Sequence, residues 1–342
     1  MDLKIKVDQT SEVPVYKQLI ESVQDLISSN MLNGGDFLPS MNQMAEDLQI
    51  SKETVKKAYS ILRDKEFIES AQGKGFFVTN KKHKVKVLVL FDKLSTYKHV
   101  LFSSLSSQIG SISEITIRLH NQDIDLFEHF IEENLNKFDY YIITPHFPLQ
   151  PEIQKRMLQI LKRIPNRKLL VLDRNVKNLP GNFGCVYQDL EQDIYEGLSE
   201  EIEVLKKFRK LNVLAMPGSM YAPLILKGIE KCCREHSLNY KIYHDIDTSI
   251  IEKGETFLIL NGQLDKELIE LVRTAKMKGC RIGQDIGIIS YNESPINEII
   301  LDGLTVFSTD FKQMGYLAGK MITEKSFKKI RCDFHLIRRS TF

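Results

Sequence analysis

"LPSMNQMAEDLQISKETVKKAYSILRDKEFIESAQGKGFFV" (residues 38–78) holds two short helix patterns that follow each other closely. The first is expected to begin at Ser40, where Gln43 three positions later completes a capping box. The second is expected to begin at Ser51, and its apolar residues recur at helical spacing: Val55, Ala58, Tyr59 and Leu62. Another amphipathic helix pattern precedes both, after Pro14. Two amphipathic helices joined by so short a connection predict a helix-turn-helix.

A β-hairpin is predicted directly after the second of these helices. A strand pattern begins at Phe67, the tripeptide Gly-Lys-Gly at 73–75 provides a permissive turn, and a second strand pattern runs over 76–78. The tip of the hairpin carries the positive charge of Lys74. A hairpin appended to a helix-turn-helix predicts a winged-helix domain.

Positive charge is concentrated on the helix that begins at Ser51. Residues 51–63 contain four basic side chains and one acidic one, a net charge of +3. Residues 1–80 as a whole contain nine basic and twelve acidic side chains, a net charge of −3. Lys52 and Lys56 lie on the same side of the helix. An ordinary solvated surface mixes both signs of charge, so this segregation indicates a recognition helix that enters the major groove of DNA.

Residues 14–78 resemble the winged-helix domain of GntR-type transcription regulators. The matching features include the helix start at Pro14, Leu-Pro-Ser at 38–40, Thr-Val at 54–55 and the Gly-x-Gly wing at 73–75. The resemblance implies that double-stranded operator DNA is a partner. The residues expected at the DNA interface are Ser40, Asn42, Ser51, Lys52, Thr54, Lys56, Gly73 and Lys74.

The chain departs from this family at three positions. The family usually has arginine where this sequence has Asn42, Lys52 and Lys56. Lysine is a point charge without the bidentate fork by which arginine reads guanine. Asn42 either pairs with an adenine or faces solvent. The operator sequence is therefore not transferable from the family.

The basic segment KKHKVKV (81–87) marks a boundary between domains. We expect a winged-helix domain over residues 1–80, a linker over 81–84, and an effector-binding and dimerisation domain over 85–342. The lysines of the linker either add contacts to DNA phosphates or form a solvated hinge.

Strand and helix patterns alternate throughout residues 85–342. The predicted strands are 85–91, 114–119, 139–144, 168–173, 211–216, 256–260 and 286–290. The helix patterns between them include 122–136, 189–206, 220–236 and 264–278. Such alternation predicts parallel sheets covered by helices, and the length of the segment predicts two α/β lobes.

Polar side chains follow several predicted strands, at the position where open parallel sheets bind their ligands. They supply carboxylate, guanidinium, amide, imidazole, amine and phenol groups: Lys93, Tyr97, His146, Asp173, Arg174, Asn261 and Asn292. Such groups typically line a carbohydrate site, because they bond to hydroxyls and cover the apolar face of a ring. Each residue alone is more simply explained as a cap or turn former. Their recurrence at several strand ends favours an effector site.

Residues 279–322 resemble the closing part of LacI-type regulators and type 1 periplasmic sugar-binding proteins. The resemblance implies a two-lobed, periplasmic-binding-protein-like domain that holds a small effector between its lobes. Lys227 stands where the family has a sugar-gripping arginine, and Asn292 stands where it has an aspartate. These differences leave a neutral sugar, a deoxy or modified sugar, and a sugar phosphate as alternatives. Together with the winged helix, the architecture is similar to that of the arabinose-responsive repressors.

The same resemblance implies three crossings of the chain between the lobes. We expect them near residues 174–186, 303–309 and 323–330. The first lobe would then comprise residues 85–175 and 308–324.

Composition excludes several other classes of protein. The 342 residues are 42% hydrophobic and 27% charged, with a net charge of only +2, which is typical of a globular chain of two or three domains. No apolar run approaches a membrane span, and the N-terminus lacks a signal-peptide pattern, so a cytoplasmic location is expected. The five cysteines form no metal-binding spacing and are expected to fill the core. No metal or cofactor is expected.

The predicted function is regulation of transcription by a homodimeric repressor that responds to a carbohydrate-like effector. The chain has no P-loop, G-x-S-x-G or H-E-x-x-H motif, so it is not expected to be an enzyme. The alternatives are a sugar-binding or scaffold protein with a non-functional DNA-binding head, and an enzyme that acts on a sugar. Whether the effector releases or promotes DNA binding does not follow from the sequence.

Overall fold

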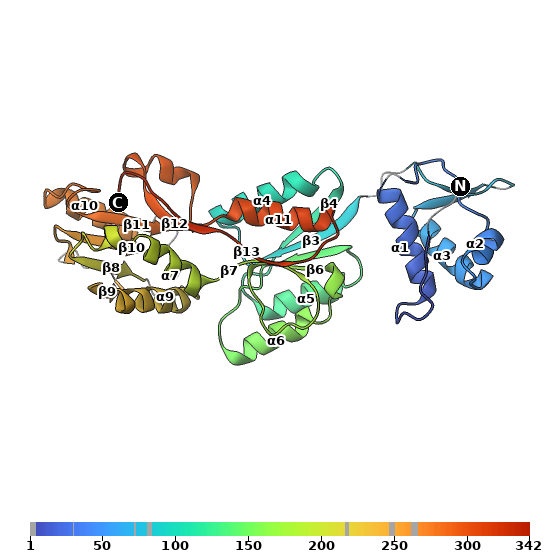
Figure 1. The fold of residues 1–342 in the computed structure, drawn as a ribbon, viewed down its shortest axis with the longest axis horizontal. Helices are drawn as coiled ribbons and strands as arrows, with labels where there is room; N and C mark the ends of the chain where they lie inside the picture. Colours follow the sequence, from blue (N-terminus) through green and yellow to red (C-terminus); the bar gives the residue numbers. More distant parts are fainter. Residues whose placement is uncertain are drawn as a thin grey trace. The chain divides into compact units, whose positions relative to one another are not determined.

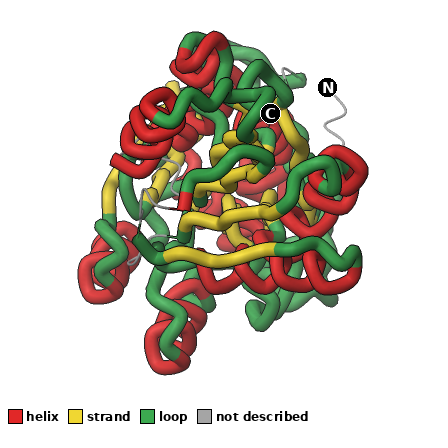
Figure 2. Tube along the Cα trace, turned by 90° about the vertical axis from the view of Figure 1, so that its left-hand side faces the viewer, coloured by secondary structure: helices red, strands yellow, loops and turns green. Residues whose placement is uncertain are grey.

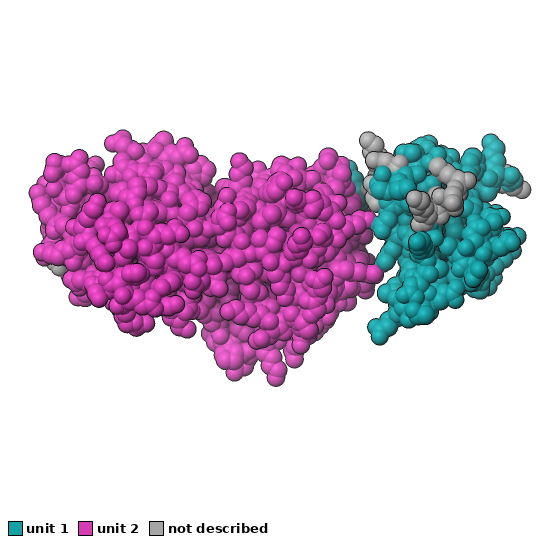
Figure 3. Space-filling model, in the orientation of Figure 1, with its two compact units in different colours: residues 1–84 teal, residues 85–342 magenta. Residues whose placement is uncertain are grey.

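The computed structural model describes most of the chain: residues 5–29, 31–71, 73–80, 84–215, 219–245, 250–260 and 266–342. The chain divides into two compact units, residues 1–84 and 85–342, which are coloured teal and magenta in Figure 3. No helix within the described ranges combines the length and the apolar character that a membrane span requires.

The first unit consists of three helices and a hairpin (Figure 1): α1 (Val15–Ser28), α2 (Met41–Asp47), α3 (Lys52–Asp64), β1 (Ile68–Ala71) and β2 (Gly75–Val78). The apolar side of α3 is buried at the four predicted positions. The hydroxyl of Tyr59 donates a hydrogen bond to the carbonyl of Pro39 at 2.9 Å, which ties α3 to the start of α2. β1 and β2 pair antiparallel around a turn in which Gly73 and Gly75 have φ angles of +78° and +92°. The predicted helix-turn-helix and wing are confirmed.

The N-terminal cap of α2 is only half of the predicted capping box. The Ser40 hydroxyl accepts a hydrogen bond from the backbone N–H of Gln43 at 3.2 Å, as expected. The side chain of Gln43, however, donates to the carboxylate of Asp47 at 2.8 Å and does not return to Ser40. A hydrogen bond to a charged acceptor is stronger than one between neutral groups, which explains the preference.

The second unit consists of two lobes, each built on a six-stranded sheet. In lobe 1 the strands lie in the order β13-β7-β6-β5-β3-β4, and all neighbouring strands are parallel. Its elements are β3 (Val85–Phe91), α4 (Thr96–Ile109), β4 (Ser113–Leu119), α5 (Ile124–Asn134), β5 (Tyr140–Ile143), α6 (Pro151–Leu161), a 3-10 turn (Asn166–Lys168), β6 (Leu169–Arg174), β7 (Gly184–Gln188), α11 (Phe311–Thr323) and β13 (Lys329–Arg331).

Lobe 2 repeats this plan with the strand order β14-β12-β11-β10-β8-β9, in which only β14 is antiparallel to its neighbour. Its elements are α7 (Leu190–Glu200), α8 (Ile202–Leu205), β8 (Lys210–Leu214), α9 (Ala222–Glu235), β9 (Tyr240–Tyr243), β10 (Glu255–Ile259), α10 (Lys266–Met277), β11 (Gly287–Tyr291), two 3-10 turns (Pro295–Glu298 and Ile300–Asp302), β12 (Thr305–Thr309) and β14 (Phe334–Ile337). The predicted two-lobed α/β fold is thereby confirmed.

The two sheets correspond strand by strand, and the correspondence extends to special residues at the strand ends. β6 and β11 occupy the third position in their sheets. Each has a residue with left-handed backbone at its carboxyl end: Asp173 (φ +73°) is the second-last residue of β6, and Asn292 (φ +68°) directly follows β11. β7 and β12 occupy the second position, and their last residues, Gln188 and Thr309, are joined by a hydrogen bond of 3.0 Å.

The chain crosses between the lobes after β7, after β12 and after β13. The first crossing lies just beyond the predicted 174–186, because β7 pairs with β6 and keeps the chain in lobe 1 until Gln188. The third crossing lies between β13 and β14, just beyond the predicted 323–330. Lobe 1 therefore extends past residue 175 and also includes both α11 and β13. The five residues of β7, Gly-Cys-Val-Tyr-Gln, are too short a run to stand out as a strand in the sequence.

Helices cover both faces of each sheet, so that the strands lie between them (Figure 2). In lobe 1 one apolar cluster packs under α5 and α6 and a second packs under α4 and α11. In lobe 2 the two clusters lie under α7 and α9 and under α10. All five cysteines are buried, as expected for residues that fill the core.

α11 lies against α4 although more than 200 residues separate them in the chain (Figure 1). Glycine permits this close approach. A Cβ atom placed on Gly315 would come within 2.2 Å of the Leu101 carbonyl oxygen and 2.9 Å of the Leu105 backbone nitrogen. Because both neighbours are backbone atoms of a helix, they cannot move aside individually.

We predict that Gly315→Ala lowers the free energy of unfolding of the second unit by about 1–3 kcal/mol, because the added methyl group overpacks the helix interface. Urea denaturation of the purified chain measures the change. Lys312→Ala, at an exposed position of the same helix, serves as the control and should change stability by less than about 0.5 kcal/mol. A stable Gly315→Ala variant would show that the two helices do not pack this closely.

Candidate functional site

Helix α3, the predicted recognition helix, begins with a well-formed cap. The Ser51 hydroxyl accepts a hydrogen bond from the backbone N–H of Thr54 at 3.1 Å, and the two hydroxyl oxygens lie 2.8 Å apart. The side chains of Lys52 and Lys56 are exposed, and the amine of Lys56 lies 3.7 Å from the Glu53 carboxylate. An exposed pair of this kind contributes little to stability, so both lysines are free to bind an anionic partner.

The remaining predicted DNA contacts are also accessible. Ser40 and Asn42 are exposed at the start of α2, and Gly73 and Lys74 are exposed at the tip of the wing. By contrast, the amine of Lys57 lies 4.0 Å from the centre of the Tyr16 ring, so this lysine packs on the domain itself. Basic side chains that are accessible at α3 and at the wing form a candidate surface for DNA.

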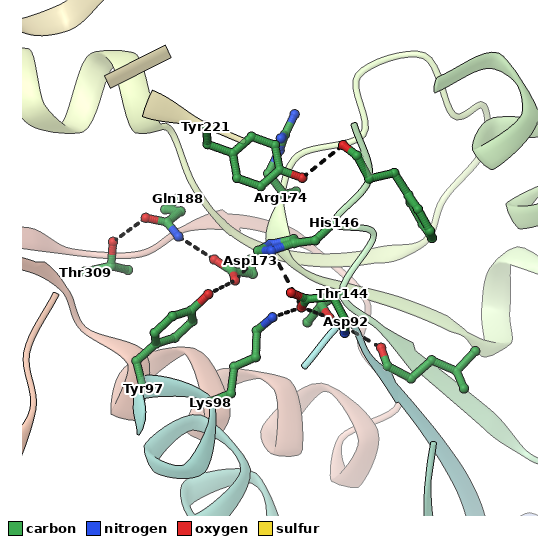
Figure 4. A network of polar contacts seen from close by, with 12 residues as sticks. Asp92, Tyr97, Lys98, Thr144, His146, Asp173, Arg174, Gln188, Tyr221 and Thr309 are labelled. Carbon is green, nitrogen blue, oxygen red and sulfur yellow. Dashed lines mark hydrogen bonds and ion pairs between the residues drawn. The ribbon is translucent and has the colours of Figure 1, made fainter. Parts of the chain in front are cut away.

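In the second unit, the carboxylate of Asp173 is the centre of a buried polar network at the carboxyl edge of the lobe 1 sheet (Figure 4). One of its oxygens lies 3.0 Å from Nε2 of His146, and the Tyr97 hydroxyl donates to the same oxygen at 3.5 Å. The other oxygen accepts a hydrogen bond from the side-chain amide of Gln188. The partners come from α4, from the loop after β5 and from the end of β7, so the carboxylate joins three elements.

A second buried carboxylate, that of Asp92, extends this network. It forms an ion pair with Lys98, which is fully buried on α4, and lies 3.6 Å from Nδ1 of His146. The backbone N–H of Asp92 donates to the Thr144 hydroxyl at 3.2 Å. The His146 ring therefore lies between two carboxylates, as Figure 4 shows.

Burial and charge both change the pKa values in the network. Burial lowers the pKa of His146 to about 4, although Asp173 opposes the change. Burial acts to raise the pKa of Asp173, but His146, Lys98 and Gln188 outweigh it and lower the value to about 2. Burial also lowers the pKa of His120, whose ring bonds to the Thr144 carbonyl, to about 4. Near neutral pH the network thus contains an ionised Asp173 carboxylate and two neutral imidazoles.

Lobe 2 contacts the network through Tyr221, immediately before α9. Its ring lies 4.2 Å from the guanidinium carbon of Arg174 and meets the His146 ring edge-on, with 5.1 Å between centroids. Its hydroxyl donates to the Phe147 carbonyl at 3.4 Å. A cavity of about 310 Å³ lies beside Arg174 and is lined by both lobes, with Leu224 of α9 on one side and Met157 of α6 on the other.

The structure brings together four of the predicted effector residues, Tyr97, His146, Asp173 and Arg174. Lys227 is exposed on α9 and takes no part in the network. Asn292 follows β11 in lobe 2, where its side-chain oxygen is buried without a hydrogen-bond partner in the described part of the chain. Asn261 lies outside the described residues.

Other members of the network were missed in the sequence. Asp92 is the first residue after β3, but the interpretation selected its neighbour Lys93, which is exposed. Lys98 lies within a helix and carries no recognisable signal. The roles of Gln188 and Thr309 in the network become apparent only when the crossings between lobes are placed correctly. These residues end the two strands, β7 and β12, after which the chain passes to the other lobe.

Residues 15–78 match the family model described as "Bacterial regulatory proteins, gntR family". The chain carries a GntR-type winged helix. The chain is 32% identical over 75 residues to the HTH-type transcriptional repressor YtrA of Bacillus subtilis, which corresponds to 22% of this chain and 58% of that repressor. The chain thus spans less than two thirds of the length of that relative.

The second unit is similar in fold to LacI-type proteins. A dimeric Lac repressor with an 11-residue C-terminal deletion aligns with a TM-score of 0.59 and 16% identity over 75% of this chain and 98% of that chain. A periplasmic binding protein/LacI transcriptional regulator from Alkaliphilus metalliredigens, complexed with D-xylulofuranose, aligns with a TM-score of 0.54 and 16% identity, again over 75% of this chain and 98% of that chain. The combination of a GntR-type winged helix with a LacI-type fold confirms the predicted architecture.

We predict that the folded protein becomes less stable as the pH falls from about 6.5 towards 4. In this range the unfolded chain protonates its histidines, whereas the pKa values of His120 and His146 in the folded state are lowered to about 4. Each histidine then lowers the free energy of unfolding by at most about 1.4 kcal/mol per pH unit. Urea denaturation at pH 7.5, 6 and 5 measures the slope.

The matched variants are His146→Gln and His129→Gln. His129 is exposed on α5 beside Glu133, so its removal should leave the slope unchanged. His146→Gln should flatten it. Equal slopes in wild type and His146→Gln would contradict the assignment of a buried neutral imidazole.

Proposed function

We propose that the chain is a transcription repressor whose affinity for operator DNA is controlled by a small carbohydrate-like effector bound between the two lobes. One observation carries the proposal. A GntR-type winged helix is continuous in the chain with a two-lobed unit in which a buried polar network lies at the lobe boundary. The first part supplies a means of binding DNA, and the second supplies a site at which a small molecule alters the protein.

DNA binding would use α3 and the wing. In this proposal α3 enters the major groove, where Lys52 and Lys56 contact phosphates or bases, and Thr54 and Ser40 contact phosphates. Lys74 at the tip of the wing adds a further phosphate contact. All of these side chains except Thr54, which is half-buried, are exposed, and this accessibility supports the assignment.

The effector would act through lobe closure. Asp173 belongs to lobe 1, and Gln188 connects its carboxylate to Thr309, where the chain returns from lobe 2. A ligand that prefers one arrangement of the lobes shifts the population towards that arrangement. In a two-fold dimer, such a shift changes the spacing of the DNA-binding heads, which lowers or raises operator affinity without altering any base contact.

We also propose that the chain is a homodimer that acts in the cytoplasm. Several large apolar side chains of lobe 2 are exposed, among them Met277 at 79% on α10 and Ile299 at 76% in the loop after β11. Exposed apolar surface of this kind favours contact with a second copy. The relative with the Lac repressor fold is described as dimeric.

The chain is proposed to bind its effector without converting it. The relatives matched in sequence and fold are regulators of transcription, which agrees with the expectation that the chain is not an enzyme. Operator affinity, measured by fluorescence anisotropy with and without each of a panel of sugars, tests the proposal. A chain that binds no DNA, or whose DNA affinity no bound compound alters, would contradict it.

We predict that Lys52→Ala weakens binding to operator DNA about tenfold and reduces the slope of log affinity against log salt by about 1, because one phosphate contact is lost. The DNA for this measurement is selected from a random pool with the full-length protein. Lys155→Ala, which removes an exposed lysine from α6, is the control and should leave both quantities unchanged. If Lys52→Ala kept the full affinity and slope, α3 would not face the DNA.

A further inference from the structure

Arg174 differs from every other partly buried arginine in the described part of the chain. The others pair with carboxylates: Arg156 with Asp125 and Glu128, Arg331 with Asp193 and Glu196, and Arg339 with Glu293. Arg174 forms no ion pair within the described residues. Its guanidinium lies over the ring of Tyr221, and one of its terminal nitrogens is buried without a hydrogen-bond partner.

A guanidinium held in this way lacks an anion. An aromatic ring attracts a cation less strongly than a paired carboxylate does. A buried charge without a partner of opposite charge is destabilising. The nearest carboxylate in sequence, Asp173, is already engaged by His146, Tyr97 and Gln188. The network therefore provides no counter-ion for Arg174, and its charge remains available to a ligand.

The cavity of about 310 Å³ begins at Arg174 and has a polar wall suited to a hydroxylated compound. Asn175, Asn178 and Gln154 line it, and Lys177 adds a second, exposed cation. The Gln154 amide nitrogen donates to the Pro148 carbonyl at 2.8 Å, which leaves the side-chain oxygen as an acceptor.

Two acidic residues also line the cavity, but neither forms an ion pair with Arg174 in the described part of the chain. The Asp189 side chain caps α7 by accepting a hydrogen bond from the backbone N–H of Gln192 at 3.4 Å. Glu191 is exposed. The volume is at the lower end of the range for small-molecule sites, which suits a compound of the size of a single sugar residue with a charged group.

We propose that the effector is an anion that also carries hydroxyl groups, such as a sugar acid or a sugar phosphate, and that Arg174 binds its anionic group. The inference rests on the proposed function, because it names the chemical class of the effector in that function. The planar fork of arginine matches a carboxylate or a phosphate with two parallel hydrogen bonds. The guanidinium packs over the ring of Tyr221 from lobe 2, which keeps it in place, so the anion would be bound where the lobes meet.

The test is a thermal-shift and calorimetric comparison of the full chain with three sets of compounds. The sugar acids are gluconate and galacturonate, the sugar phosphates are glucose 6-phosphate and ribose 5-phosphate, and the neutral counterparts are glucose, galactose and ribose. Inorganic phosphate is a separate arm that reports binding of the anion alone. We expect at least one acid or phosphate to raise the melting temperature, and its neutral counterpart to bind at least about tenfold more weakly.

Three variants assign the effect to Arg174. Arg174→Gln should lower the affinity for the charged compound roughly 10- to 100-fold. Arg174→Lys should lower it less, since lysine keeps the positive charge but not the planar guanidinium that forms two parallel hydrogen bonds. Arg156→Gln removes an arginine of α6 that is already paired with carboxylates and should leave binding unchanged. The melting temperature without ligand shows whether each variant is folded.

Several outcomes would overturn the inference: neutral sugars that bind as tightly as the charged ones, no binding by any acid or phosphate, or unchanged affinity in a folded Arg174→Gln variant. Operator binding, measured in parallel, separates the two proposals. If a neutral sugar alters operator affinity, the anionic class is wrong but the proposed function stands. If a charged compound binds through Arg174 and operator affinity does not change, the anion site stands but the proposed function is wrong.

Discussion

The carboxylate of Asp173 is fully buried, and the arrangement of the second unit follows from the need to pair it. An ionised carboxylate removed from water is strongly destabilising unless hydrogen bonds and opposite charges replace its hydration. Here the replacement comes from α4, from the loop after β5 and from the end of β7. The left-handed backbone of Asp173 directs its side chain to this point, and such a conformation persists only where the surroundings hold it in place. We therefore regard Asp173 as the residue that organises the cleft.

The connections of Asp173 continue to the places where the chain passes between lobes. Gln188 ends β7 and accepts a hydrogen bond from Thr309, which ends β12. At the third crossing, Arg331 of β13 bonds to the buried Asp193 of α7 at 2.6 Å. All three crossings thus carry polar contacts that depend on the relative position of the lobes. Weak contacts between exposed groups would transmit little of a change in lobe position. Buried polar contacts, by contrast, have discrete arrangements and resist gradual deformation.

The sequence was most informative where one local rule determined the outcome. Ser51 and the apolar spacing of α3 correctly predicted the second helix of the helix-turn-helix, and the rule for strand ends identified His146 and Asp173 as part of one network. It was least informative where distant segments meet. Lys98 is a charged residue inside a helix, and nothing in its neighbourhood distinguishes it from a solvated lysine. β7 is not among the predicted strands, because its short run of residues is a strand only through pairing with β6 and β13. Tyr221 joins the network from the other lobe, a contact that no local pattern encodes.

The most direct test of this account is the effect of Thr309→Val on the coupling between effector and operator. The substitution removes the hydroxyl that donates to Gln188 but keeps the shape of the side chain. Operator affinity is measured by anisotropy for wild type and variant, with and without the compound that stabilises the wild type most. The account predicts that the effector changes the operator affinity of the wild type at least about fivefold. In the variant it predicts a clearly smaller change, with the same affinity in the absence of effector. A variant that responds as fully as the wild type would contradict it.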